Sequence, residues 1–296
     1  MKRFAWVVGA LMAAHTVCVA QTLSTPEPQR HDRDALGYYH FSHRYPSLVR
    51  HGITVVDLPE EESFFAYWVP PTNSIQSVMV LLHGTGGTAY DELADEIDMA
   101  KYYGYAIVGL QWLDKRSGRY ATPLVINKML DHAMRHLIER YGQTPKTVAL
   151  CGFSRGSVTS FEVAYRDRLS GHYLDMVIAH SGGIPTDHVT APSEHAGPDA
   201  FYEDLDEGVL GAPFAGLRFF LYAGCQDEQW GSTMCEYMRY TRDLVKKNGG
   251  DVAACIIDPT GTHDGYRRTL AYHRQAILLW LGKSSALDPA PRSPLP

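Results

Sequence analysis

The sequence has few cysteines, no long run of like charge and only one sustained hydrophobic stretch. Five cysteines among 296 residues are too few for a small scaffold built on disulfides. Lysine and arginine number 27 against 33 aspartates and glutamates, so we expect no basic face and no nucleic-acid partner. With 45% hydrophobic and 20% charged residues, the composition also excludes a disordered or collagen-like chain and indicates a globular protein.

The hydrophobic stretch lies at the N-terminus. Two basic residues precede the apolar run Phe4 to Ala14, and the small-residue sequence Cys18-Val19-Ala20 follows it. A membrane-spanning helix needs about 20 apolar residues, so this run is too short to be one. The pattern is typical of a signal peptide over residues 1–20, with cleavage before Gln21. We therefore expect a secreted or periplasmic protein without a stable membrane anchor; an uncleaved anchor and a lipidated Cys18 are the alternatives.

Residues 51–282 form a domain in which short apolar runs alternate with helical stretches. An extended lead-in over 21–50 precedes it, and a Pro-rich tail over 283–296 follows it. Strands that alternate with helices predict an α/β domain, in which helices cover both faces of a mostly parallel sheet of about eight strands. The expected strands are Ile53 to Leu58, Phe64 to Val69, Val78 to Leu82, Tyr105 to Leu110, Val148 to Gly152, Met176 to Ala179, Leu217 to Tyr222 and Val252 to Ile257. The expected helices are Tyr90 to Tyr103, Pro123 to Tyr141, Gly156 to Arg168, Ser232 to Lys247 and Tyr266 to Leu281.

Residues 184–213 interrupt this alternation. The segment is rich in proline and acidic residues and is much longer than an ordinary connection of about 4 to 6 residues. Long loops at the carboxyl ends of parallel strands often shape a binding site. We therefore expect an insertion over the active-site face.

The sequence Gly152-Phe153-Ser154-Arg155-Gly156 lies between an expected strand and an expected helix. In a G-x-S-x-G turn of this kind the chain bends so sharply that the serine is strained and exposed, and neighbouring side chains would clash. The pattern predicts Ser154 as a catalytic nucleophile. The alternative is a glycine-bounded turn with an idle serine.

Two downstream loops carry candidate partners for this serine. Asp227 follows the strand that ends near Tyr222, and His263 follows the strand that ends near Ile257. The order serine, aspartate, histidine is the order of the α/β-hydrolase triad, in which the histidine takes the serine proton and the aspartate orients the imidazole. Other acids that could fill the role of Asp227 are Glu228, Asp258 and Asp264. His188 and His195 are alternative histidines, although neither follows a strand.

A glycine-rich turn, His83-Gly84-Thr85-Gly86-Gly87, directly follows the expected strand Val78 to Leu82. Such a turn brings backbone N–H groups close to a substrate, as an oxyanion hole requires. We expect the N–H groups of Thr85 and Arg155 to be the two donors, and the choice within residues 84–86 stays open. A phosphate-binding loop would need a following Lys-Ser or Lys-Thr pair, which the sequence lacks. We expect His83 to support the turn.

These four motifs, the last two being Gly224-Cys225-Gln226-Asp227 and Gly261-Thr262-His263, resemble those of secreted α/β-hydrolase esterases. Within that superfamily the sequence is similar to the branch of polyhydroxybutyrate depolymerase-like and feruloyl or acetylxylan esterase-like enzymes. The resemblance implies an α/β-hydrolase fold over about residues 50–282 and a serine esterase that needs no metal or cofactor. It also implies an ester substrate, either small or linked to a polymer. Arg155 departs from the small or apolar residue that many members carry.

Two other functions remain open. A serine peptidase would use the same triad, although exopeptidases of this fold usually carry a sizeable extra domain that we do not expect here. A catalytically idle member of the fold would bind a partner or ligand instead. For substrate binding we single out Arg155 and Trp112. Arg155, together with Lys115, Arg116 and Arg119, either binds a carboxylate or sugar hydroxyl of the substrate or is a tolerated elbow residue among solvated loop charges.

Removal of the signal peptide leaves four cysteines. We expect a disulfide between Cys225 and Cys235, because a separation of ten residues across a strand end and a helix start lets the chain fold back on itself. The alternative is that both are free. The strand order implied by the resemblance puts two strands between those of Cys151 and Cys255. Because that is farther apart than a disulfide tolerates, we expect both to be free, buried thiols.

Overall fold

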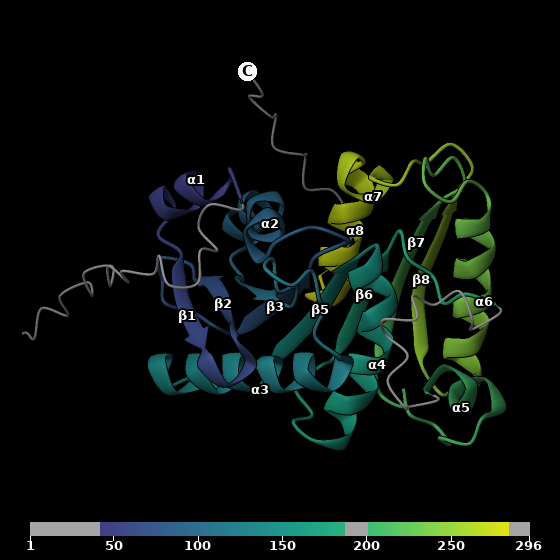
Figure 1. Cartoon of the computed structure of the whole chain (residues 1–296), viewed down its shortest axis with the longest axis horizontal. Coiled ribbons are helices and arrows are strands. Elements are labelled where there is room, and N and C mark those ends of the chain that lie inside the picture. Colours follow the sequence, from purple (N-terminus) through teal and green to yellow (C-terminus); the bar gives the residue numbers. More distant parts are fainter. Residues whose placement is uncertain (1–41, 187–200, 284–296) are drawn as a thin grey trace, which may run out of the picture. The chain divides into compact units, whose positions relative to one another are not determined.

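The computed structural model describes residues 42–186 and 201–283, and all eight expected strands form one sheet (Figure 1). Its order is β1-β2-β4-β3-β5-β6-β7-β8. The pairs β1–β2 and β2–β4 are antiparallel, and the neighbours from β4 to β8 are parallel. The expected signal peptide and Pro-rich tail lie outside the described residues. The strands are β1 (Thr54–Leu58), β2 (Ser63–Trp68), β3 (Ser77–Leu82), β4 (Ala106–Gln111), β5 (Thr147–Phe153), β6 (Met176–His180), β7 (Arg218–Gly224) and β8 (Asp251–Asp258).

Helices cover both faces of this sheet. One face packs against α1, α2, α7 and α8, and the other against α3, α4, α5 and α6. In Figure 1, α2 and α8 are drawn above the middle of the sheet and α3 below it. The helices are α1 (Tyr45–Arg50), α2 (Ala89–Tyr103), α3 (Pro123–Tyr141), α4 (Arg155–Leu169), α5 (Phe201–Glu207), α6 (Thr233–Lys247), α7 (Gly265–Arg268) and α8 (Leu270–Trp280), with the 3₁₀ turn η2 (Pro59–Glu61).

Helices α2 and α3 begin and end where their sequences dictate. Thr88 precedes α2 and forms a capping box with Asp91, so two N–H groups at the helix start are satisfied. Thr122 caps α3, and Pro123 occupies its first position, where a missing N–H costs nothing. Both helices end at a glycine with positive φ, which is the usual left-handed helix end. These local signals explain why the expected bounds of both helices agree with the structure.

Two expectations about helices need correction. The lead-in over 21–50 ends in the short helix α1, whose Leu48 is buried against the sheet. The last helix, expected as one piece over Tyr266 to Leu281, is divided into α7 and α8 at Thr269, whose ψ of 90° is extended. The division lets α7 follow the loop of His263 while α8 covers the sheet.

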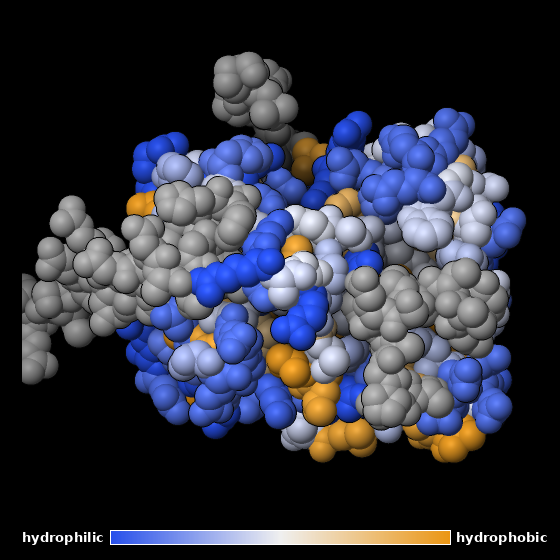
Figure 2. Space-filling view, viewed as in Figure 1, coloured by the Kyte–Doolittle hydropathy of each residue, from blue (hydrophilic) through white to orange (hydrophobic). Residues whose placement is uncertain are grey.

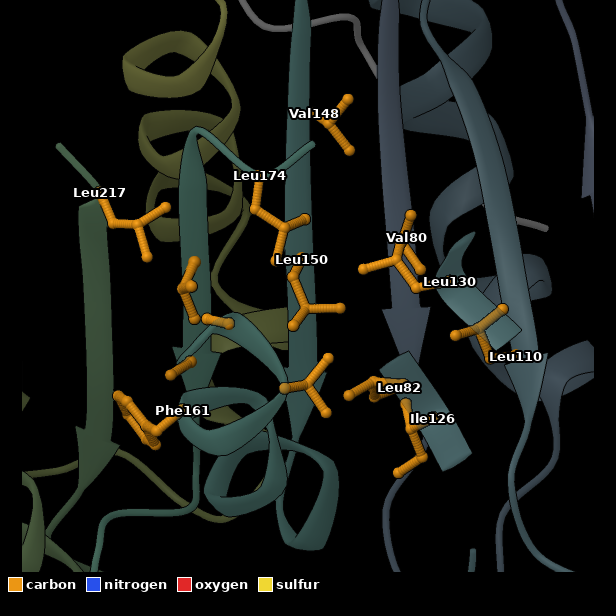
Figure 3. Packing of buried hydrophobic residues seen from close by; sticks show 14 of the residues in the cluster. Val80, Leu82, Leu110, Ile126, Leu130, Val148, Leu150, Phe161, Leu174 and Leu217 are labelled. Carbon is orange, nitrogen blue, oxygen red and sulfur yellow. The ribbon is translucent and has the colours of Figure 1, made fainter. Parts of the chain in front are cut away.

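The core consists of two layers, one on each side of the sheet. Val80 and Leu82 of β3 face α3, whereas Met79 and Leu81 face the opposite layer, as the two-residue period of a strand requires. Figure 3 shows Val80 and Leu82 beside side chains of α3. The strands are therefore apolar on both faces, which explains their continuous hydrophobic runs.

The expected insertion over 184–213 is described only in part, because residues 187–200 lie outside the described residues. Its helix α5 packs on α4 and on the end of α6: the Tyr202 hydroxyl donates to the Val158 carbonyl (3.0 Å), and Asn248 Nδ2 donates to the Leu205 carbonyl (3.0 Å). Ile184 is fully buried. Both described ends of the segment are thus joined to the core.

The surface in Figure 2 is mainly hydrophilic, and its hydrophobic residues form small separate groups. Within the ranges 42–186 and 201–283, every helix is too short or too polar to cross a bilayer.

Candidate active site

Ser154 occupies a sharp turn between β5 and α4. Its φ of 53° and ψ of −117° are rare for a residue with a side chain, and its N–H donates to the His180 carbonyl of the neighbouring strand β6 (3.0 Å). Helix α4 begins at the next residue. A strained serine between a strand and a helix has the geometry of a nucleophile elbow.

The two glycines of the motif are required by close backbone contacts. A Cβ atom on Gly152 would lie 2.4 Å from the Gly156 carbonyl oxygen, and one on Gly156 would lie 2.4 Å from the Leu82 carbonyl oxygen. Both neighbours are backbone atoms, which cannot move aside as a flexible side chain does. A side chain at either position would therefore clash with the backbone, as the motif predicts.

Asp227 and His263, which we expected to act as acid and base, are hydrogen-bonded to each other. Asp227 Oδ2 lies 2.5 Å from His263 Nδ1, and the Asp227 side chain is fully buried. Asp227 Oδ1 accepts hydrogen bonds from the N–H groups of Gln229 (2.8 Å) and Trp230 (2.9 Å), which fix the carboxylate. With Nδ1 directed at the carboxylate, Nε2 is the imidazole nitrogen available to a neighbouring group.

Both backbone polar groups of His263 are hydrogen-bonded to side chains of other segments. Its N–H donates to Glu228 Oε2 (2.9 Å), and its carbonyl accepts from the Ser181 hydroxyl (2.5 Å). Glu228 thus contacts the backbone of His263 and not its ring, so Glu228 is not the acid of this pair. Ser181 was not expected from the sequence, although its place directly after β6 is a signal for this edge of the sheet.

The His263 ring packs against the nucleophile elbow. The His263 ring centroid lies 5.0 Å from that of Phe153, the residue before the serine. Ser154, Thr85 and His263 all line one cavity of about 350 Å³. The three segments that the sequence singled out, far apart along the chain, therefore meet at one place.

The glycine-rich turn lies opposite the elbow. The Gly86 N–H donates to the Tyr120 hydroxyl (2.7 Å) and the Gly87 N–H to the Gly84 carbonyl (3.1 Å), so these two groups are already used. This removes Gly86 from the range left open for the oxyanion donor and leaves Gly84 and Thr85. The side chains of Arg155 and Thr85 are also joined, since Arg155 Nε donates to Thr85 Oγ1 (3.2 Å).

His83 supports this turn from below. Its ring is fully buried, Nδ1 lies 2.9 Å from the Gly84 carbonyl, and the ring stacks on Trp112 at 5.1 Å. Burial lowers the pKa of His83 to about 4, which keeps the imidazole neutral. The expectation of a supporting role agrees with this geometry.

Of the two residues singled out for substrate binding, Trp112 is absent from the cavities beside Ser154, whereas Arg155 lines one of them, of about 110 Å³. Trp112 is 1% exposed and packs between His83 and Tyr120, so its ring supports the turn and does not contact a ligand beside Ser154. It borders a separate cavity of about 730 Å³. The Arg155 guanidinium lies 4.2 Å above the Tyr120 ring and thereby connects α4 to the turn. Lys115 also serves the turn, because its Nζ donates to the Gly86 carbonyl.

Arg267 is a further residue that the sequence did not reveal. Its guanidinium lies 4.1 Å above the Phe153 ring, and it forms ion pairs with Glu92 and, at 3.0 Å, with Asp95 of α2. Burial by itself lowers the pKa of Arg267, but the two carboxylates outweigh this effect, so the pKa is raised. Burial also raises the pKa of Glu92 to about 7 against the attraction of Arg267. The contacts join segments more than 100 residues apart, so no local pattern announces them.

The cysteines are paired as expected. Cys225 and Cys235 form a disulfide with a Cα separation of 5.3 Å, and it connects the loop before Asp227 to α6. Cys151 and Cys255 are free thiols, with β6 and β7 between their strands. One correction concerns Cys255, which is partly exposed because it lies on the edge strand β8.

No described group of three or more His, Cys, Asp or Glu side chains is arranged to hold a metal ion. The side chains that the structure brings together at the candidate site are those of Ser154, His263 and Asp227.

Comparison with known proteins gives structural matches only. No family model and no curated protein matches the sequence. A fungal esterase from Rhizomucor miehei superposes with a TM-score of 0.56 at 16% identity, covering 86% of this chain and 92% of the other. An esterase from Pyrococcus furiosus gives a TM-score of 0.56 at 17% identity, covering 80% and 94%. The chain has the α/β-hydrolase fold.

An acylaminoacyl peptidase from Pyrococcus horikoshii is also similar, with a TM-score of 0.51 at 16% identity. The match covers 82% of this chain and 45% of the peptidase. At identities this low, the likeness shows the fold alone.

Proposed function

We propose that the protein is a serine hydrolase that cleaves a carboxylic ester through an acyl-serine intermediate. The observation that carries the proposal is the hydrogen bond between Asp227 and the His263 ring beside a strained Ser154. The esterases among the structural neighbours support ester hydrolysis as the general reaction.

In this reaction His263 Nε2 takes the proton of Ser154 Oγ as the oxygen attacks the ester carbonyl. The N–H groups of Thr85 and Arg155 stabilise the oxyanion that forms. The bond from carbon to the alcohol oxygen then breaks, and His263 returns the proton to the departing alcohol. Water repeats the sequence on the acyl-serine and releases the acid. Asp227 stabilises the imidazolium at both stages.

The decisive experiment replaces the nucleophile. We expect Ser154→Ala to fold normally and to lose activity on p-nitrophenyl acetate by several orders of magnitude, because the triad acts as a unit. A fluorophosphonate probe should label Ser154 in the wild type, as mapped by peptide mass spectrometry. Ser170→Ala, an exposed serine at the end of the same helix, is the matched control. Labelling at another residue, or full activity in Ser154→Ala, contradicts the proposal.

A peptidase is the second candidate, since an acylaminoacyl peptidase is among the proteins that share this fold. Ester and amide hydrolysis use the same groups, so substrates must separate them. We expect faster turnover of p-nitrophenyl esters than of matched N-acyl p-nitroanilides, beyond the intrinsic difference in reactivity. A panel that includes feruloyl, acetylated-sugar and polyester substrates tests the branch that the motifs resemble.

We also propose that residues 1–20 direct export and are then removed. The disulfide between Cys225 and Cys235 supports this, because disulfides persist in oxidising compartments outside the cytosol. N-terminal sequencing of the protein from its native host should begin near Gln21, and an intact Met1 would refute the proposal.

A further inference from the structure

Ser154 lies between two cavities of different character. The larger, of about 350 Å³, is lined by the charged residues Glu228, Asp264 and Arg268 together with His263. The smaller, of about 110 Å³, is lined mainly by Val158, Gly182, Gly183, Pro185, Trp230, Met234 and Tyr237. Ser181, Gln229 and Arg155 also border it, and the Arg155 guanidinium is held over the Tyr120 ring. Ser154 and Thr85 border both cavities, whereas His263 borders only the larger one.

This asymmetry sets the direction in which an ester binds, if the proposed function is correct. The general acid must reach the oxygen of the departing alcohol, so the alcohol lies on the side of His263. The acyl chain, attached to the same carbonyl carbon, then extends to the opposite side. We infer that the small apolar cavity receives a short acyl chain and that the large charged cavity receives a hydroxyl-bearing alcohol.

The size of the small cavity limits the acyl chain. A cavity of about 150 Å³ accommodates benzene, so 110 Å³ has room for a chain of only a few carbons. Its walls cannot retreat easily, because a Cβ on Gly183 would already lie 2.6 Å from the Met238 N–H nitrogen of α6. The disulfide at Cys235 further fixes α6, which supplies Met234 and Tyr237. The cavity is therefore a rigid slot.

The charges of the large cavity favour a polar alcohol. Glu228 and Asp264 offer hydrogen-bond acceptors and Arg268 offers donors, and Arg268 lies 3.3 Å from Asp264. Hydroxyl groups both donate and accept, so a polyol can satisfy all three side chains. An alkyl chain in the same place would remove water from these charges without replacing its hydrogen bonds, which is unfavourable.

The acyl side is tested with p-nitrophenyl esters of two to eight acyl carbons. Each methylene that fits the slot should raise kcat/KM about fourfold, and the value should fall once the slot is full, at about four carbons. Val158→Ala removes two methyl groups from the slot wall, so the optimum should move to an acyl chain one or two carbons longer. Val209→Ala, the same change at a side chain that is 67% exposed, should leave the profile unchanged.

A wild-type optimum at eight carbons, or an optimum that Val158→Ala does not move, overturns the assignment of the acyl side. Either result leaves the proposed function intact as long as Ser154→Ala is inactive. Activity in Ser154→Ala would instead remove the proposed function itself, so the two failures are distinguishable.

The alcohol side is tested with a matched pair of aliphatic esters, glycerol monobutyrate and butyl butyrate. We expect kcat/KM to be at least about tenfold higher for the glycerol ester, because a site built for hydroxyl groups rejects an analogue without them. Arg268→Leu should reduce this ratio while leaving the acyl-length profile unchanged. A ratio of one or below in the wild type, or an unaltered ratio in Arg268→Leu, overturns the assignment of the alcohol side.

Discussion

One guanidinium group contacts three segments of the candidate active site. Arg267 lies four residues after His263, stacks on Phe153 of the elbow, and pairs with Glu92 and Asp95 of α2, the helix that follows the glycine-rich turn. A planar guanidinium can stack and form two ion pairs at once, which an ammonium cannot. We therefore regard Arg267 as a positioning residue for the histidine and the serine.

We expect Arg267→Lys to fold and to lose about tenfold in kcat with little change in KM, because the charge remains while the stacking on Phe153 is lost. Arg267→Met should lower the free energy of unfolding by about 3 kcal/mol, because Glu92 is then buried without its partner. Steady-state kinetics and urea unfolding measure the two effects. Arg135→Lys, in an exposed pair with Asp131, is the matched control and should change neither.

A positioning role of Arg267 also predicts a change in the reactivity of Ser154. The rate at which a fluorophosphonate labels Ser154 should fall in Arg267→Lys along with kcat. Wild-type kcat in Arg267→Lys would show that the ion pairs serve stability alone.

At the scale of single elements, the strands and most helices follow from local sequence. Val78 to Leu82 and its counterparts are short, apolar and flanked by turn residues, and each became a strand within two residues of its expected bounds. Thr88 and Thr122 announce helix starts in the same local way. The break at Thr269 has no such signal, because it depends on how α7 and α8 pack against distant parts of the chain.

In the candidate site, too, some residues could be predicted from local sequence and others could not. Ser154, Asp227 and His263 each follow a strand, so sequence order and spacing predicted that they would meet at one edge of the sheet. Ser181 and Arg267 act through contacts with segments between 82 and 175 residues away, and Trp112 is covered by neighbours from other segments. Burial and long-range pairing of this kind are properties of the folded chain.

The disulfide between Cys225 and Cys235 closes the loop that carries Asp227. We expect the double variant Cys225→Ser, Cys235→Ser to lose about 2 to 3 kcal/mol of stability, since the disulfide restricts the unfolded chain. Activity should fall further than stability alone explains, because Asp227 and α6 lose a shared anchor. Urea unfolding and kcat/KM at a temperature well below the unfolding transition separate the two effects.

Cys255→Ser, which alters a free thiol, is the control for this variant and should leave activity unchanged. Equal stability of the double variant and the wild type under non-reducing conditions would show that the disulfide is absent from the protein in solution.

At the scale of the whole molecule, buried titratable groups determine how stability responds to acid. Burial lowers the pKa of His83 to about 4 and that of His180 well below its usual value. The unfolded chain then binds more protons than the folded chain as the pH falls from about 6.5, so these histidines destabilise the fold in acid. Glu92 acts in the opposite direction, because burial raises its pKa to about 7 and the folded chain takes up the proton first.

The histidines and Glu92 change the free energy of unfolding in opposite directions as the pH falls, so the pH dependence of the wild type does not separate them. A pair of single variants separates them. His83→Gln removes a group whose unfavourable protonation costs the wild type about 2 kcal/mol between pH 7 and pH 5. The variant is less stable than the wild type at pH 7, where its core is perturbed, and this deficit should shrink by about that amount at pH 5. Glu92→Gln should show the reverse, a deficit that grows as the pH falls. Urea unfolding of the three proteins at both pH values measures these differences, and a deficit of His83→Gln that is the same at pH 7 and pH 5 would mean that the imidazole is not held neutral by burial.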